Sequence, residues 1–303
     1  MKRLCIFLLM LIHFTVAAQQ LQCRVIDSET GQPLSYATIL LNHQSRVVYT
    51  DSTGEFFLHK DSLQAGDSIC VVYLGFEKFC VAVDSLKAKN RFLLVSERNE
   101  LNPVTVSNCQ KFRNYLINRR TGSIDNYLGP GPETKIIIIG RYPGKNNREG
   151  YIRQLRIFAG TFNGKARVPV RLRWYQWDAI HGMPGKELTS RNILLYPYQK
   201  GWNSFQLPAD AIYFPPEGIV LGLEFIYPME FVQEYTGLVT TREKADWLMQ
   251  MEHRWSLGMQ TVRDNTQRGF YIINNDGVRA YASRGNNYFI KPAIKFIIAR
   301  CEK

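Results

Sequence analysis

The sequence predicts an all-β protein with two β-sandwich domains, the second of jelly-roll type with a short helical insert. Three observations predict this class. Short runs rich in Val, Ile, Tyr and Phe alternate with turn residues about every eight to twelve positions. No long segment has the periodicity of a helical core. The chain has 303 residues, enough for two domains that each bury their own core.

The first eighteen residues, MKRLCIFLLMLIHFTVAA, have the pattern of a secretory signal peptide. Lys2 and Arg3 give a positive start, residues 4–16 are apolar, and small residues end the segment. The run is short and His13 interrupts it, which argues against a membrane span. We expect cleavage after Ala18 and an exported chain without a transmembrane segment. The chain would be periplasmic or outer-membrane-associated, and a place on the cell surface stays open.

Residues 19–107 predict short strands joined by tight polar turns. The strands are LQCRVID, LSYATILL, RVVYT, EFFLH, a hairpin in AGDSICVVYLGFEKFCVAV, and KNRFLLV. In the turn SETGQP, Gly31 and Pro33 supply the backbone geometry. In the turn DSTG, Asp51 can bond its own turn backbone and Gly54 can adopt a positive φ. We predict that these four residues are structural.

Five cysteines remain after the predicted signal peptide: Cys23, Cys70, Cys80, Cys109 and Cys301. An odd number in an oxidising compartment indicates a free thiol or an intermolecular bond. The hairpin places Cys70 roughly opposite Cys80, but directly opposed strand positions often suit disulfide geometry poorly. A bridge between these two and buried free thiols are both open.

Three motifs occur in order in the first predicted sandwich. V-x-D-x-x-T-G-x-P-L-x-x-A-T-I spans residues 25–39, and TDSTGEF and GDSICVVYLGF follow it. This order resembles the carboxypeptidase-regulatory-like domain over residues 21–107. The resemblance implies a transthyretin-like β-sandwich of the kind found in exported Gram-negative envelope proteins. It does not imply peptidase activity, because no His of the mature chain has the Glu three positions on that a zinc carboxypeptidase needs.

Residues 108–135 predict a linker, in which CQKFRNYLINRR could form a short helix and GPGPE a hinge or loop. Residues 136–303 return to strand signals such as KIIIIGRY, GIVLGLEFIY and AIKFIIAR, which indicate the jelly-roll-like sandwich. Its middle part resembles the C-terminal region that often accompanies the regulatory-like domain. The insert 229–262 departs from that pattern, and its segment REKADWLMQMEHRW has apolar residues near helical spacing. We expect a packing helix or lid there rather than a membrane contact.

The basic charge is concentrated in the second half of the chain. Residues 19–107 hold 8 Lys and Arg against 10 Asp and Glu, whereas residues 108–303 hold 28 against 16. A basic domain outside the cytoplasm suits an anionic glycan, the envelope surface or an acidic protein better than nucleic acid. A solvated basic surface without a specific partner is the alternative.

The segment VPVRLRWYQWD is the candidate ligand-binding strand. Strand alternation places Val170, Leu172 and Trp174 on a core face. The other face holds two guanidinium groups and two flat rings, which suit an anionic sugar or an acidic peptide; these belong to Arg171, Arg173, Tyr175 and Trp177. In the alternative, the two rings are buried under the insert, and the arginines are only solvent-exposed residues at a sheet edge.

No motif in the sequence indicates catalysis, and we expect no catalytic residue, cofactor or metal. G-x-S-x-G is absent, and NNDG fits a hairpin turn better than a calcium loop. Glu224 and Asp178 are the carboxylates that a glycosidase would need, although Glu224 is expected to point outward from its strand. We therefore predict a non-catalytic envelope binding or scaffold protein with a basic recognition domain. A glycan-active enzyme on a jelly-roll scaffold is the alternative.

Overall fold

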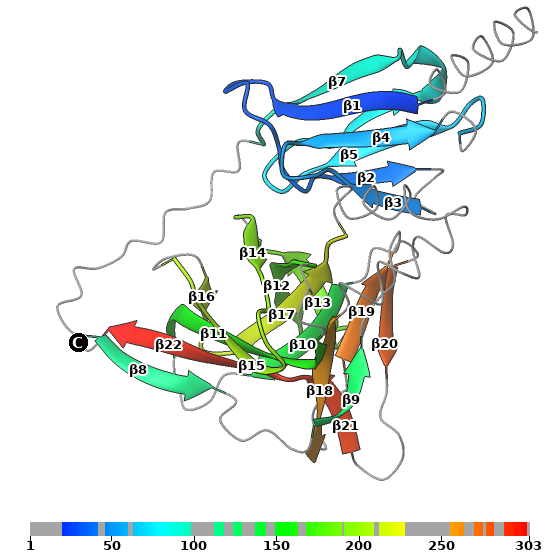
Figure 1. Ribbon diagram of the computed structural model, residues 1–303. Coiled ribbons are helices and arrows are strands. Elements are labelled where there is room, and N and C mark those ends of the chain that lie inside the picture. Colours follow the sequence, from blue (N-terminus) through cyan, green and yellow to red (C-terminus); the bar gives the residue numbers. More distant parts are fainter. Residues whose placement is uncertain are drawn as a thin grey trace, which may run out of the picture. The chain divides into compact units, whose positions relative to one another are not determined.

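Figure 1 shows the computed structural model, which is built of β-sheets with a short 3-10 helix at Val83–Ser85. The predicted all-β class is confirmed. The chain divides into two compact units, residues 1–99 with 228–234 and residues 100–227 with 235–303. The structure describes residues 20–41, 46–59, 63–97, 112–117, 124–128, 137–143, 149–162, 168–189, 191–208, 212–227, 255–263, 270–274, 277–281 and 288–301.

In the part of the chain that the structure describes, no helix has the length and hydropathy that a membrane span requires. The predicted signal peptide, residues 1–18, lies outside the described residues.

The first unit is a sandwich of a three-stranded and a four-stranded sheet. The order of the first sheet is β4 (Glu55–His59), β1 (Gln20–Asp27) and β7 (Lys89–Leu94). The order of the second is β3 (Arg46–Tyr49), β2 (Thr38–Leu41), β5 (Ser68–Val72) and β6 (Phe79–Ala82). Alternate side chains of β1, such as Cys23 and Val25, are buried in one core cluster with Ile39, Ile69 and Val71 of the second sheet.

The predicted turns of this unit have the expected geometry. The Asp51 carboxylate accepts hydrogen bonds from the backbone N–H groups of Thr53 and Glu55, both at 2.8 Å. Gly54 has φ +76°, and a Cβ there would lie 2.9 Å from the carbonyl oxygen of Val25. Gly31 also has positive φ, +69°, but a Cβ there would meet no atom within 4 Å. Pro33 forms an isolated bridge with Ile26.

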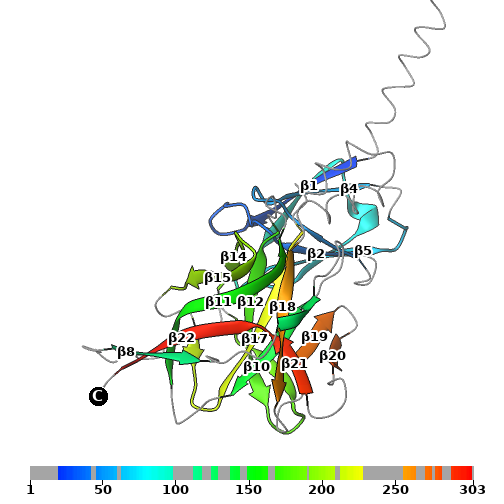
Figure 2. The ribbon, with the colours of Figure 1, turned by 60° about the horizontal axis from the view of Figure 1, so that its bottom comes forward.

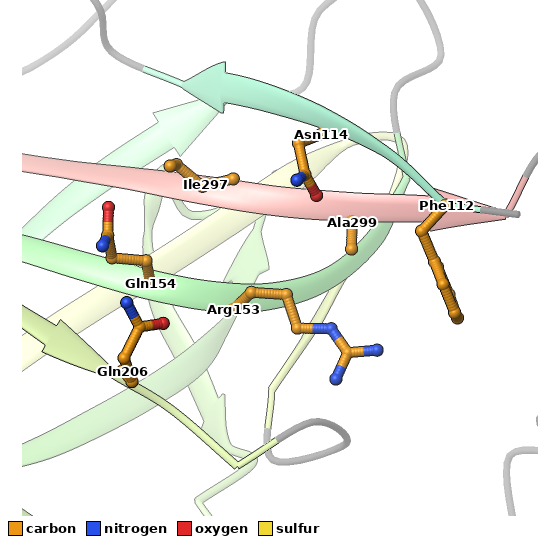
Figure 3. Close-up of a pocket in the computed structure, with 7 residues that line it drawn as sticks. All are labelled: Phe112, Asn114, Arg153, Gln154, Gln206, Ile297 and Ala299. Atoms are coloured by element: carbon orange, nitrogen blue, oxygen red, sulfur yellow. The ribbon is translucent and has the colours of Figure 1, made fainter.

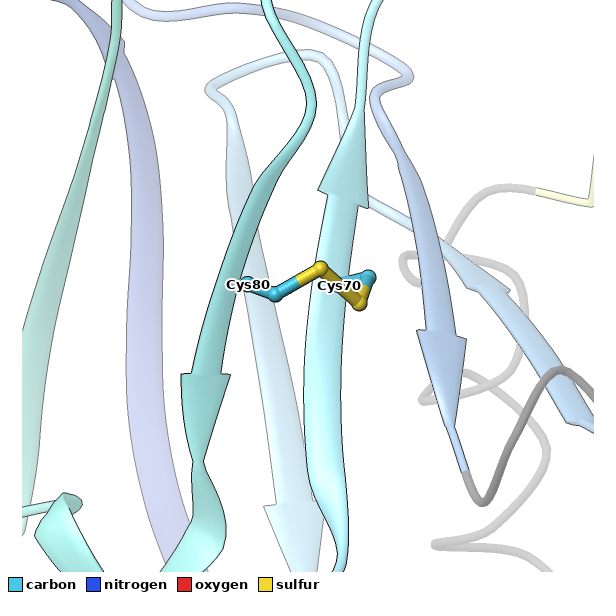
Figure 4. The surroundings of a disulfide bond; sticks show 2 residues. All are labelled: Cys70 and Cys80. Carbon is cyan, nitrogen blue, oxygen red and sulfur yellow. A yellow bond between two sulfur atoms is a disulfide. The ribbon is translucent and has the colours of Figure 1, made fainter.

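The hairpin of β5 and β6 carries a disulfide between Cys70 and Cys80, drawn in Figure 4. The two residues are register partners with their Cα atoms 4.1 Å apart. Facing residues of antiparallel strands approach this closely at positions without mutual backbone hydrogen bonds, which brings the two side chains together. Of the two possibilities left open by the sequence, the bridge is the one that forms. Cys23 is a buried free thiol, and burial raises its pKa to about 12.

The second unit consists of a seven-stranded and an eight-stranded sheet (Figure 2). In the seven-stranded sheet the order is β13 (Met183–Glu187), β12 (Val170–Asp178), β17 (Gly218–Phe225), β10 (Ile137–Pro143), β19 (Phe270–Asn274) and β20 (Gly277–Tyr281), and β14 (Ile193–Leu195) also pairs with β12. In the eight-stranded sheet the order is β21 (Tyr288–Pro292), β18 (Trp255–Arg263), β11 (Gly150–Phe162), β22 (Ile294–Cys301) and β8 (Phe112–Ile117). β15 (Gly201–Gln206) and β16 (Tyr213–Phe214) pair with β11, and β9 (Ile124–Leu128) pairs with β18.

The inner faces of these two sheets form the core of the second unit. Tyr142 of β10 lies with its ring 5.5 Å from that of Phe296 in β22 and donates a hydrogen bond of 2.9 Å to the carbonyl of Pro292. Phe214 also contacts Phe296, at 5.4 Å between ring centroids. Along β22 the buried Ile294, Phe296 and Ile298 alternate with side chains that point away from the core. We call the side that these others occupy the outer face of the eight-stranded sheet.

Two sequence-based expectations are corrected here. The segment 108–135, expected as a linker with a short helix, instead contributes β8 and β9 to the eight-stranded sheet. β8 forms there because β22 offers a partner edge, on which Ile117 is buried opposite Phe296. The insert 229–262 is also too long, since residues 255–262 belong to β18, which pairs with β9, β11 and β21. The rest of the insert, with most of the expected helix, lies outside the described residues.

Gly54→Ala and Gly31→Ala test the turn roles as a matched pair. Both force a side chain into the left-handed region, which costs about 1–2 kcal/mol. Only Gly54→Ala adds a close contact with Val25, so it should lower the free energy of unfolding by about 2–3 kcal/mol, more than Gly31→Ala does.

Urea unfolding of the full protein separates the two units. All tryptophans follow residue 173, so tryptophan fluorescence reports the second unit alone. The circular dichroism transition of Gly54→Ala should move to lower urea while the fluorescence transition stays in place. Equal losses of unfolding free energy in the two alanine variants would show that the close contact at Gly54 does not affect stability.

Candidate functional site

The arginines of the predicted ligand-binding strand form a buried ion cluster. Glu224 of β17 is the register partner of Arg171 and is 0% exposed, and Arg171 is 2% exposed. The Glu224 Oε2 atom lies 3.3 Å from Nη1 of Arg171 and 2.8 Å from Nη1 of Arg173. Arg171 also donates from Nε to Asn192 at 2.8 Å, and Arg173 pairs with Glu187 of β13. We call Arg171, Arg173, Glu187 and Glu224 the buried ion cluster.

The burial of Arg171 and the low exposure of Arg173 therefore do not favour a ligand-binding face on this strand. Tyr175 is buried as well, and its hydroxyl lies beside the Arg173 guanidinium. Trp177 is half-buried and packs on the cluster of Ile137, Tyr175 and Val220. Burial lowers the pKa of the Arg173 guanidinium, but Glu224 and Glu187 outweigh burial and hold that pKa above its ordinary value. The positive charges of this strand are thus balanced internally.

The two carboxylates considered for glycosidase chemistry do not share a site. The sequence suggested that Glu224 points outward. In the structure it instead points inward, to the arginines. Asp178 ends β12, where it accepts hydrogen bonds from the backbone of Ile180 and pairs with His181. Asp178 is seven residues from Arg171, the register partner of Glu224, which is roughly 23 Å along a strand and beyond the spacing that glycosidases use. Among the described residues no metal-ligating group of His, Cys, Asp or Glu is found.

A groove of about 340 Å³ lies on the outer face of the eight-stranded sheet (Figure 3). Four neighbouring strands, β8, β22, β11 and β15, provide its walls. The lining residues are Phe112, Asn114, Arg153, Gln154, Gln206, Ile297 and Ala299. A β-bulge between Ile152 and Gln154 shifts the register of β11, and this lets the consecutive residues Arg153 and Gln154 both line the groove.

The groove combines one cation, three side-chain amides and one ring. The Arg153 guanidinium lies 5.2 Å from the centroid of Phe112, a side chain that is 45% exposed. Gln154 and Gln206 are register partners on β11 and β15, and Asn114 enters from β8 (Figure 3). Amides both donate and accept hydrogen bonds, whereas Arg only donates. The groove therefore offers polar contacts of both kinds beside an exposed ring.

Two further cations stand together on the same outer face. Arg156 of β11 and Lys295 of β22 are register partners, and both approach the Trp202 ring of β15, at 5.6 Å and 4.4 Å from its centroid. Burial lowers the pKa of the Lys295 ammonium, and the charge of Arg156 lowers it further. The Arg156 Nε atom is buried without a hydrogen-bond partner in the described structure. We call Arg156 and Lys295 the cation pair.

The cations of the outer face differ from those of the buried ion cluster in their partners. Among the residues that the structure describes, none forms an ion pair with Arg153, Arg156 or Lys295. Sequence reasoning missed these three because strict alternation in YIRQLRIF would place Arg153 and Arg156 on opposite faces, and only the bulge brings them to a common face. Lys295 joins them only through pairing between strands far apart in the sequence.

Comparison with known families identifies the first unit. Its two sheets and its turns are those expected of the regulatory-like sandwich, and the match to the CarboxypepD_reg-like domain model covers residues 21–106. The first unit is a CarboxypepD_reg-like domain. The matched segment of this domain includes all seven of its described strands, β1 to β7. No curated protein matches the chain.

The losses of unfolding free energy in Glu224→Gln and Glu187→Gln should show whether the buried ion cluster stabilises the fold more than a surface ion pair would. Glu224→Gln leaves two guanidinium groups without their shared buried carboxylate, which should cost about 3–5 kcal/mol of unfolding free energy. Glu187→Gln should cost about 1–2 kcal/mol, because Arg173 keeps Glu224. Urea unfolding followed by tryptophan fluorescence measures both, and equal small losses would contradict a structural role for the cluster.

Proposed function

We propose that the second unit is a non-catalytic recognition domain that binds an anionic ligand, a glycan or an acidic protein, in the groove of its outer face. The CarboxypepD_reg-like domain would act as its spacer or docking unit in an exported envelope protein. The observation that supports this most directly is a groove with an arginine, three amides and an exposed ring, none of which is needed by the core. The excess of basic residues over residues 108–303 supports it further.

The architecture favours binding over a surface that is merely solvated. The groove lies on the face of four hydrogen-bonded strands, so the backbone positions that carry its polar side chains are set before a ligand arrives. Arg153 has no described acidic partner, so its guanidinium keeps donors for a carboxylate or another anion. By contrast, the arginines of the buried ion cluster already donate to Glu224, Glu187 and Asn192.

A binding role is also favoured over the glycan-active alternative. Hydrolysis of a glycosidic bond usually requires two carboxyl groups about 5–10 Å apart. Among the described residues, those that line the groove include no Asp or Glu. Arg153 and the amides can hold and orient an anionic ligand, but they supply neither the general acid nor the nucleophile of that reaction.

Arg153→Ala should weaken binding of anionic polymers by at least about tenfold. A hydrogen bond to a charged group contributes roughly 1.5–3 kcal/mol, and about 1.4 kcal/mol is tenfold in affinity. Titration calorimetry with polygalacturonate and with poly-L-glutamate measures the effect, and Arg91→Ala is the control, since Arg91 is an exposed cation of β7 in the first unit.

The wild-type protein should bind at least one of the two polymers, and added salt should weaken that binding. Binding to neither polymer would overturn the proposal. Equal affinities of Arg153→Ala and Arg91→Ala would show that the attraction depends only on net charge and not on the groove.

A further inference from the structure

We infer that the ligand of the outer face is an oligosaccharide that carries a carboxylate, with that carboxylate bound between Arg156 and Lys295 beside Trp202 and the sugar hydroxyls bound by the groove amides. This inference rests on the proposed function and names its ligand class. It joins two features of one sheet, the groove and the cation pair.

The register places the groove and the cation pair next to each other. Gln154 lies across from Ile297 on β22 and from Gln206 on β15, and all three line the groove. Two residues further along β11, Arg156 lies across from Lys295 and Ser204. That step is roughly 7 Å along the strand and returns to the same face. A ligand longer than one sugar ring can therefore contact both features.

The cation pair has the electrostatics of an anion site. Like charges at directly opposed strand positions destabilise a sheet, and contact with the shared Trp202 ring offsets this only in part. The described groups that neighbour Lys295 across the strands are Arg156 and, beyond it, Ser204 and Trp202, none of which is acidic. A bound carboxylate would relieve the repulsion and accept charge-assisted hydrogen bonds from the two cations.

The surroundings favour a glycan over an acidic peptide. Extended peptides commonly bind by adding a strand to a free sheet edge. β11 and β22, which form the floor of the groove, are paired on both sides there, so an added strand could join only the outer edges of β15 and β8. The groove instead presents side chains: the amides of Asn114, Gln154 and Gln206 match sugar hydroxyls, which also donate and accept. Phe112 adds an exposed ring on which a sugar can stack.

Arg156→Gln and Lys295→Gln test the carboxylate position, with trigalacturonate as the probe in titration calorimetry. Each should weaken binding by about tenfold or more, the loss of one charge-assisted contact. Lys295→Arg keeps the charge and should retain most of the affinity. Lys186→Gln removes an exposed cation of β13 in the other sheet and should leave binding unchanged. The tryptophan fluorescence transition in urea shows whether each variant is folded.

A second readout separates contact from general charge effects. On binding of trigalacturonate, the pKa of the Lys295 ammonium should rise, because a carboxylate stabilises the charged form that Arg156 and burial disfavour. Lysine side-chain nuclear magnetic resonance during a pH titration measures this. Galactotriose, the neutral counterpart, should produce no such rise and should bind more weakly.

The outcomes distinguish this inference from the proposed function. If penta-L-glutamate binds as tightly as trigalacturonate and depends on the same residues, the groove binds anions and the glycan assignment is overturned. If trigalacturonate binding is lost in Arg153→Ala but unchanged in Arg156→Gln and Lys295→Gln, the carboxylate position is overturned and the groove stands. If no anionic probe binds the wild-type protein, both proposals fail.

Discussion

The complete burial of Glu224 is the constraint that organises the charges of the second unit. A carboxylate removed from water must be matched by cations, and Arg171 and Arg173 on the adjacent strand provide them. Because Arg171 and Arg173 are paired with Glu224, the arginines of the predicted ligand-binding strand are not open to a ligand. This pairing leaves the seven-stranded sheet with a balanced interior and shifts the question of ligand binding to the other sheet.

On the eight-stranded sheet the balance is different. Arg153, Arg156 and Lys295 lie on its outer face, and the described structure gives them rings as neighbours but no acid. A protein tolerates such a group of like charges at a cost in stability, and a cost of this kind is typical of a binding surface. The bulge in β11 contributes directly, because it sets Arg153 beside Gln154 on the wall of the groove. The bulge therefore helps to build the site, and it is also the reason why strict alternation along the strand does not predict it.

The sequence was sufficient for the features that depend on local chemistry. The turns at Gly31 and Asp51, and the strands that flank them, follow from positive φ, side-chain capping and alternation within a few residues. It was insufficient where distant strands decide the outcome. The sequence of β8 alone also fits a short helix, and its partner β22, about 180 residues further along the chain, makes it a strand. Alternation on β12 correctly grouped Arg171 with Arg173, but it does not show that Glu224 lies across from them.

The most direct test of the account is to map the binding surface with amide and side-chain nuclear magnetic resonance while trigalacturonate is added. The account predicts that the side-chain amides of Asn114, Gln154 and Gln206 and the indole of Trp202 shift together, with one affinity, while the signals of the buried ion cluster stay in place. Shifts concentrated on β12 and β17, or no saturable shifts at all, would contradict it.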